Sequence, residues 1–156
     1  DTQLKNPMGL HYYGVVKTVE GLLFVGEQGI VQRQITADEF NVENPSEGTL
    51  FGILSLGNQT FIAYGLRGKV LRSLDDGKTW NSVGSGIEAS IQAGAVLPDG
   101  AILLVAENGQ MISSHDRGGT FNLLPTRGLP TAYVLPVSAK SLIAVGPLGP
   151  QTFPVP

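Results

Sequence analysis

The chain has 156 residues, a formal net charge of -3 and no cysteine. The lack of cysteine excludes disulfide and thiol chemistry, and the mild acidity with scattered basic residues argues against a nucleic-acid partner. The composition, 42% apolar and 15% charged with 21 glycines and 10 prolines, is typical of a globular protein with frequent turns. The longest apolar runs, such as residues 101–106, are too short to span a bilayer.

One sequence pattern recurs four times along the chain: a short apolar run, two or so variable residues and a glycine. It reads LLFVGEQG at 22–29, FIAYGLRG at 61–68, ILLVAENG at 102–109 and LIAVGPLG at 142–149. The four closing glycines follow one another at intervals of 39, 41 and 40 residues. A fixed period of this size indicates a repeat architecture, so the sequence predicts four copies of one structural unit.

Each repeat predicts four short strands. Another apolar run precedes the one described above, and turn residues such as those at 98–100 separate the two. A third extended segment follows the closing glycine, as at 69–73, and a short aromatic segment comes next, as at 79–83. Four strands in about 40 residues are typical of a β-propeller blade. The sequence therefore predicts an all-β protein, a single domain over 1–156, with antiparallel blades at approximately 11–44, 48–84, 89–125 and 131–156.

The two ends of the chain depart from the repeat. The fourth segment of the first repeat (38–42) is polar, and prolines in 150–156 favour a poor or absent outer strand in the last. Residues 1–10 belong to no repeat and are expected to supply a strand or cap an edge. Four repeats are compatible with a fragment, a closed four-bladed ring, or half of a ring completed by a second chain. An open arc exposes two sheet faces, which favours a homo-oligomer.

A second motif occurs twice, between the third and fourth predicted strands of the middle repeats. It reads SLDDGKTW at 73–80 and SHDRGGTF at 114–121, with the shared pattern Ser-x-Asp-x-Gly-x-Thr-aromatic. Ser and Asp side chains can bind nearby backbone amides, glycine allows positive φ, and the aromatic ring can pack beneath the turn. We expect a structural turn, with a metal or catalytic role for Asp75 or Asp116 as the alternative. The turn residues are Ser73, Asp75, Gly77, Thr79, Trp80, Ser114, Asp116, Gly118, Thr120 and Phe121.

This motif resembles the Asp-box, or BNR repeat, of sialidases and several other propellers. The first repeat holds a degenerate version at 34–40 and the last holds none. In GLRGKVLRSLDDGKTW (65–80), Arg72 precedes the box serine, and Arg33 occupies the equivalent position in the first repeat. That combination is similar to the Ycf48/Hcf136-like branch of Asp-box propellers. The resemblance implies a lumenal, non-enzymatic assembly factor of photosystem II with an arginine-rich surface for a membrane-protein client, although that family has seven blades.

Arg33, Arg67 and Arg72 are the predicted binding residues. Together they could form a basic patch that grips a carboxylate or an acidic peptide. The alternative is that they form ordinary ion pairs between blades, for example to Glu27 or Asp76. The predicted function is a non-enzymatic scaffold that binds a protein partner and assists the assembly or stability of a membrane or envelope complex. An exported, periplasmic location is expected, since the lack of cysteine fits one.

Two other functions stay open at this stage. The first is a sialidase-like glycoside hydrolase or a glycan-binding lectin. Such a sialidase needs three arginines around the substrate carboxylate and a tyrosine nucleophile with an acidic partner, and Tyr12 or Tyr13 is the candidate. An N-terminal edge clamp is the favoured role for these tyrosines. The second is a purely structural, self-associating fragment of a longer protein. No cofactor and no metal are predicted, because no His, Asp and Glu cluster has metal-ligand spacing.

Overall fold

The computed structural model describes residues 9–125, 128 and 130–155, and its strands form four separate antiparallel sheets. The first sheet contains β1 (Tyr12–Lys17), β2 (Leu22–Gly26), β3 (Val31–Gln34) and β4 (Phe40–Glu43). The second contains β5 (Leu50–Ser55), β6 (Phe61–Gly65), β7 (Val70–Ser73) and β8 (Asn81–Val83). The third contains β9 (Ile91–Val96), β10 (Ile102–Ala106), β11 (Met111–Ser114) and β12 (Asn122–Leu123). The fourth contains β13 (Tyr133–Ser138), β14 (Ser141–Gly146) and β15 (Gly149–Pro154).

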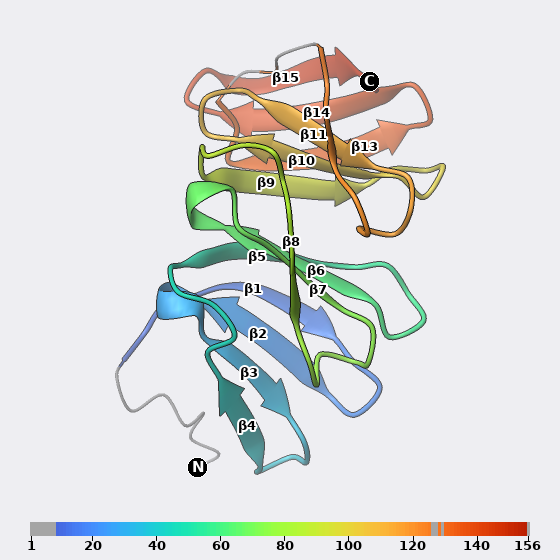
Figure 1. The fold of residues 1–156 in the computed structure, drawn as a ribbon. Coiled ribbons are helices and arrows are strands. Elements are labelled where there is room, and N and C mark those ends of the chain that lie inside the picture. The colour runs from blue at the N-terminus through green and yellow to red at the C-terminus, as the bar shows by residue number, and fades with distance from the viewer. Residues whose placement is uncertain (1–8, 126–127, 129, 156) are drawn as a thin grey trace.

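Each sheet is built from hairpins, so its strands lie in chain order from the innermost to the outermost. Figure 1 shows the four sheets following one another along the molecule, with the first and the last at opposite ends. The all-β prediction with repeated antiparallel blades is confirmed. The described part of the last blade has three strands, and Pro150 and Pro154 lie in its outer strand β15. Of the predicted N-terminal edge segment, residues 1–8 lie outside the described residues.

The closing glycines of the repeat all adopt left-handed backbone. The φ angles of Gly29, Gly68, Gly109 and Gly149 are 73°, 66°, 80° and 80°. In the first two blades the glycine ends a short 3-10 turn between the second and third strands, η1 (Glu27–Gly29) and η2 (Leu66–Gly68). A residue with a side chain is strained at these positive φ angles, so each turn requires glycine. Because each repeat contains this turn once, glycine recurs in the sequence with the period of the repeat.

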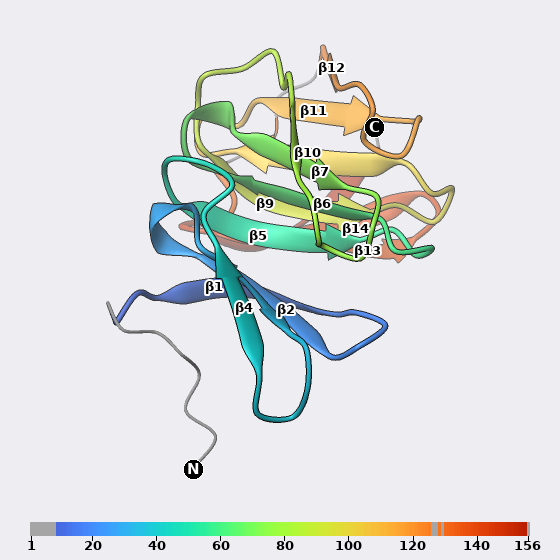
Figure 2. The ribbon, with the colours of Figure 1, turned by 60° about the horizontal axis from the view of Figure 1, so that its bottom comes forward.

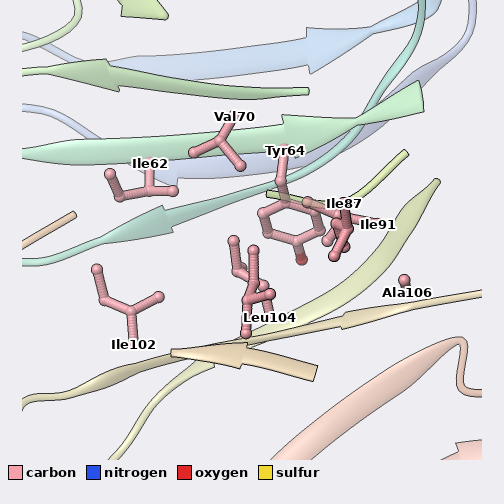
Figure 3. Packing of buried hydrophobic residues seen from close by; sticks show 9 residues of the cluster. Ile62, Tyr64, Val70, Ile87, Ile91, Ile102, Leu104 and Ala106 are labelled. Atoms are coloured by element: carbon pink, nitrogen blue, oxygen red, sulfur yellow. The ribbon is translucent and has the colours of Figure 1, made fainter. Parts of the chain in front are cut away.

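Neighbouring blades pack face to face through alternate residues of their strands. In the cluster between the second and third blades, Ile62 and Tyr64 of β6 face Ile102 and Leu104 of β10, and all four are buried (Figure 3). Successive side chains of a strand point to opposite faces of its sheet. Each blade therefore directs one set of apolar side chains toward the preceding blade and another set toward the next. The cluster between the first two blades comprises Leu23, Val25, Val31, Leu50, Ile53, Phe61, Ala63 and Leu71. The cluster between the last two comprises Ala93, Ala95, Leu97, Ala101, Leu103, Val105, Val134, Leu142 and Ala144.

The four blades form an open arc. Their innermost strands lie against one another in sequence, β1 with β5, β5 with β9 and β9 with β13. Within the described residues, β13 has no comparable packing against β1. Figure 2 shows the first sheet strongly inclined to the second, as expected when blades fan around an axis. No helix in the described chain is long and apolar enough to cross a membrane.

Candidate binding surface

The two Ser-x-Asp-x-Gly-x-Thr segments form the same hydrogen-bonded turn. In the second blade the Ser73 hydroxyl donates to Asp75 Oδ1 (2.8 Å) and accepts the Gly77 amide (2.9 Å). The Asp75 carboxylate accepts both the amide (2.9 Å) and the hydroxyl (2.6 Å) of Thr79. The third blade repeats all four bonds at 2.7 to 2.9 Å among Ser114, Asp116, Gly118 and Thr120. Each Asp is therefore fully engaged in holding its own turn.

The residue just before the turn glycine connects the second and the third blade each to the preceding one. Asp76 has φ 64° and is buried, and its carboxylate accepts the Val19 amide at 3.1 Å from the β1–β2 turn. Arg117, at the equivalent position with φ 59°, donates to the Gly57 carbonyl (3.0 Å) and to Thr60 Oγ1 (3.0 Å) in the β5–β6 turn. We call these contacts the blade latches. They help hold a left-handed conformation that costs a non-glycine residue about 1–2 kcal/mol.

The other residues of the turn also pack between blades. A Cβ on Gly77 would lie 2.8 Å from Leu23 of the first blade, and one on Gly118 would lie 2.2 Å from Ile62 of the second. Trp80 packs against the cluster between the first two blades, and Phe121 against the next cluster. The turn therefore shapes the interface between blades.

The hydrogen bonds around Asp116 predict a pH-dependent stability. Donation by the Thr120 amide and by the Ser114 and Thr120 hydroxyls holds the pKa of Asp116 well below its ordinary value. Stabilisation by such a group is present above the unfolded pKa, about 4, and is lost as the pH falls through the folded pKa. We expect Asp116→Asn to lower the free energy of unfolding most near about pH 6, and progressively less below about pH 4. Urea unfolding of both proteins across this range measures the difference, and a difference that stays constant with pH would contradict the assignment.

The three predicted arginines lie at three different places in the first two blades. Arg33 lies near the end of β3 and forms an ion pair with Glu20 Oε2, and its Nε is buried. Arg72 occupies the equivalent place on β7, half-buried, with a buried Nε that has no hydrogen-bond partner in the described structure. Arg67 lies in η2, before β7 begins, and is exposed. Arg33 therefore forms its ion pair within the first blade, with Glu20, whereas the alternative had suggested pairs between blades to Glu27 or Asp76.

A pocket of about 340 Å³ lies at the concave centre of the arc, and all four innermost strands contribute to it. Among the described residues, its walls contain aromatic rings, aliphatic and small residues and one amide, and no charged side chain. The lining residues are Tyr13, Gly14, Val15, Phe51, Gly52, Ile53, Leu54, Tyr64, Gln92, Gly94, Ala132 and Tyr133.

β-Bulges direct three of these side chains to the centre. The pairing of β1 with β2 shifts between Tyr12 and Gly14, which leaves Tyr13 as an extra residue. Phe51 is the extra residue of β5, and Gln92 lies at the register shift of β9. A bulge re-aims one side chain out of the regular alternation, which is why all three contribute to the pocket although their neighbours pack between blades. The Tyr13 and Phe51 rings are 5.8 Å apart in an edge-on arrangement.

Tyr64 supplies a phenol to the floor of the pocket from the second strand of its blade. Its side chain crosses Gly52 and Gly94, where a Cβ would lie 2.3 Å and 2.9 Å from the ring or hydroxyl atoms. Burial raises the pKa of Tyr64 to about 12, with a smaller contribution from Tyr133. The phenol therefore stays neutral at physiological pH, and the pocket offers apolar and hydrogen-bonding surface without charge.

The pocket residues other than Tyr13 were missed by the sequence analysis. One signal could have found them, since Tyr13, Phe51 and Gln92 each directly precede a small residue at the start of an innermost strand. The alignment of the repeats by their closing glycines places these residues close together in the period. Their common direction, however, depends on the bulges.

No protein-family model matches the sequence, and no curated protein matches it. Solved structures do share the fold. The computationally designed Ika4 protein has a TM-score of 0.76 at 9% identity, over 99% of this chain and 96% of that one. The WD40 β-propeller domain of Doa1 has a TM-score of 0.74 at 11% identity over 92% of this chain. The chain is a partial β-propeller.

A third similar structure is that of YCF48 bound to a D1 peptide. Its TM-score is 0.64 at 15% identity over 87% of this chain. This propeller chain spans about half the length of the YCF48 and Doa1 chains, 46% and 50% respectively. At these sequence identities the likeness establishes the propeller fold and no shared function.

The tyrosine proposed as a nucleophile lies at the rim of the propeller pocket beside an acid. The Tyr13 hydroxyl donates to Glu27 Oε1 (3.3 Å), and His11 Nδ1 lies 3.0 Å from the same oxygen. Burial and the Glu27 charge raise the pKa of Tyr13, which disfavours a nucleophilic phenolate. Neither Arg33 nor Arg72 belongs to the pocket lining. Among the described residues, the geometry therefore supplies the tyrosine and acid of a sialidase-like site, and no arginine lines the pocket beside them.

Proposed function

We propose that this chain is a non-enzymatic propeller scaffold that binds a protein partner, with an apolar or aromatic side chain of the partner seated in the central pocket. The observation that carries the proposal is the uncharged aromatic lining, which comes from four blades and is held by bulges. Apolar pockets with few convergent polar groups are the usual place for recognition in a propeller-sized domain. Aromatic residues are also the most frequent hot spots of protein interfaces.

The rim adds a cation to this apolar pocket. Arg67 is exposed in η2, at the same end of its blade as the pocket residue Phe51. We propose that it contacts a carboxylate beside the seated side chain, so the preferred segment combines an apolar residue with an acidic one. Arg33 and Arg72 would act mainly at the blade interfaces, where their side chains are half-buried. YCF48 offers a precedent for peptide binding by this fold.

We further propose that the partner is part of a membrane or envelope complex whose assembly or stability the propeller assists. A location outside the cytoplasm, such as the periplasm, is part of this proposal, as is association with further copies of the chain. Support comes from the Arg-before-Ser pattern and the resemblance to Asp-box propellers, and from the absence of cysteine.

The experiment compares peptide binding by three proteins. An array of peptides that tile the exposed segments of host membrane proteins is probed with wild type, Ala132→Trp and Leu123→Trp. Ala132 is an exposed residue of the pocket wall, so tryptophan fills the pocket without removing a core contact. Leu123 is 55% exposed on the outer strand β12, does not line the pocket, and provides the control.

We expect apolar-acidic peptides to bind wild type and Leu123→Trp, and Ala132→Trp to lose at least about tenfold in affinity, which corresponds to about 1.4 kcal/mol. Arg67→Glu should weaken the acidic members of this set most. Equal binding by both tryptophan variants would refute the pocket. Hydrolysis of a fluorogenic sialoside that is abolished in Tyr13→Phe would favour the glycosidase instead, and binding to a glycan array alone would favour the lectin.

A further inference from the structure

The two ends of the arc expose the same kinds of sheet face that are buried everywhere else in the molecule. Here the forward face of a blade is the one directed toward the next blade in the chain, and the rear face is the opposite one. On the second strands, the forward positions of the first three blades are almost completely buried, as Leu23, Ile62 and Leu103 show at 0%, 0% and 1% exposure. The equivalent forward residue of the last blade is Ile143, which is half-buried.

The forward face of the last blade is strongly apolar. Beside Ile143, the residues Tyr133, Leu135, Val137 and Val145 are 59%, 49%, 49% and 41% exposed. The pairing register of β13 with β14 places Leu135 opposite Ile143 and Tyr133 opposite Val145, on one face. The opposite face of the same sheet packs on the third blade. An exposed apolar face of this extent indicates an interaction site.

The rear face of the first blade is its counterpart. Val15, Leu22 and Val42 are 55%, 40% and 38% exposed. Leu22 is the repeat equivalent of Phe61 and Ile102, which are 2% and 0% exposed because the preceding blade covers them. The first blade lacks such a predecessor within the described chain. Gln32 is a polar exception on this face, since it takes the place of the buried Leu71 and Ile112 and accepts a hydrogen bond from Tyr12. Val15, Leu22 and Val42 are apolar and have no covering blade among the described residues.

The turns at these two ends also carry opposite charges. In both latches, the outer turn of one blade contacts the inner hairpin turn of the blade before it, and at the first of them Lys78 lies 3.9 Å from Glu20. The outer turn of the first blade, between β3 and β4, contains Asp38 and Glu39. The inner hairpin turn of the last blade, between β13 and β14, contains Lys140. If the first blade of a second copy packed after the last blade, its acidic β3–β4 turn would contact the basic β13–β14 turn.

We propose that the forward face of the last blade binds the rear face of the first blade in a second copy of this chain, and that two copies close one ring. This inference rests on the self-association put forward above and specifies its interface. A ring of two copies has two-fold symmetry, so the forward face of each copy meets the rear face of the other, and the two identical junctions together form an isologous interface. Two copies of four blades each give an eight-bladed ring, and both junctions reproduce the packing found between blades within the chain.

Ring closure also completes the binding site. Tyr13 and Tyr133 lie on the innermost strands of the first and last blades, at the two open ends of the pocket. In the ring, each of these strands acquires a neighbouring innermost strand from the second copy. The central pocket thereby becomes a channel whose wall both copies contribute, so the partner segment would contact residues of two chains.

The test measures the mass of the full 156-residue chain by light scattering and sedimentation over a range of concentrations. We expect twice the chain mass of 16.4 kDa for wild type. Val145→Asp places a charge on the forward face and should raise the dimer dissociation constant at least about a hundredfold. Leu148→Asp is the matched control, because Leu148 is 70% exposed in the β14–β15 turn, and it should remain dimeric.

A charge exchange tests the pairing of the turns without disturbing the sheet faces. Lys140→Glu should weaken the dimer about tenfold or more, and the combination of Lys140→Glu with Asp38→Lys and Glu39→Lys should restore it. A monomer at every concentration would overturn the proposal. The two apolar faces would then be covered by further blades of a longer polypeptide. Open polymers would overturn the two-copy ring. If the protein is a monomer that still binds the peptide, and Ala132→Trp abolishes this binding, the proposed function stands and the two-copy ring is wrong.

Discussion

Replacement of Gly68 by alanine is expected to be among the most destabilising single changes in this protein, at about 3–5 kcal/mol of unfolding free energy. Gly68 closes the η2 turn with φ 66°, and a Cβ there would lie 1.9 Å from the carbonyl oxygen of Ile87. The backbone must therefore shift as well as adopt a conformation that costs alanine about 1–2 kcal/mol. Because the total stability of a single domain is about 5–15 kcal/mol, the variant should lose much of it.

Gly57→Ala separates the cost of a positive φ angle from the cost of the contact with Ile87. Gly57 has φ 71°, and a Cβ there would have no neighbour within 4 Å, so alanine meets only the conformational cost. We expect it to destabilise the protein by about 1–2 kcal/mol. Urea unfolding followed by tryptophan fluorescence measures both variants. Equal losses in the two would show that the contact with Ile87 does not contribute, and that the turn tolerates a side chain in this space.

Leu104→Ala is expected to cost about 2–5 kcal/mol of unfolding free energy, because it opens a cavity in the cluster between the second and third blades. Leu104 is fully buried, and Figure 3 shows it between Tyr64 and Ile102. Each blade has only its neighbours to cover its apolar faces, so loss of packing at one interface weakens the connection between two halves of the arc.

The control for this change is Leu123→Ala on β12, where the leucine is 55% exposed. We expect a loss within about 0.5 kcal/mol for this surface position. Chemical unfolding of both variants gives the comparison, and hydrogen exchange would show whether the first two blades retain protection when Leu104 is removed. A loss at Leu104 no larger than at Leu123 would contradict the role assigned to this interface.

The blade repeat could be predicted from the sequence because its causes are local. Positive φ at Gly29, Gly68, Gly109 and Gly149 requires glycine in each turn, and that requirement appears in the sequence as a period of about 40 residues. The Ser-x-Asp-x-Gly-x-Thr turns also depend on contacts between residues close in the sequence. Asp75 binds groups no more than four residues away, so the spacing of Ser, Asp and Thr already contains its hydrogen-bond pattern.

Contacts between blades could not be predicted, because they depend on how repeats face one another. Asp76 and Arg117 are variable positions of the motif with unlike chemistry, yet both connect a turn to the preceding blade. The equal spacing of Arg33 and Arg72 predicts one basic surface. Their pairing opposite Leu23 and Ile62 places each on the face of its blade that packs against the next blade, which the spacing does not reveal.

The sequence by itself determined the number of blades, their strands and the turns that close them, since each depends on residues within one repeat. Only the tertiary structure decided the central pocket, because bulges in separate strands aim Tyr13, Phe51 and Gln92 at a common point. It also decided that the ends of the arc are uncovered. Leu22 and Val145 read as ordinary core residues in the repeat, and their exposure follows from the lack of a neighbouring blade in the described chain.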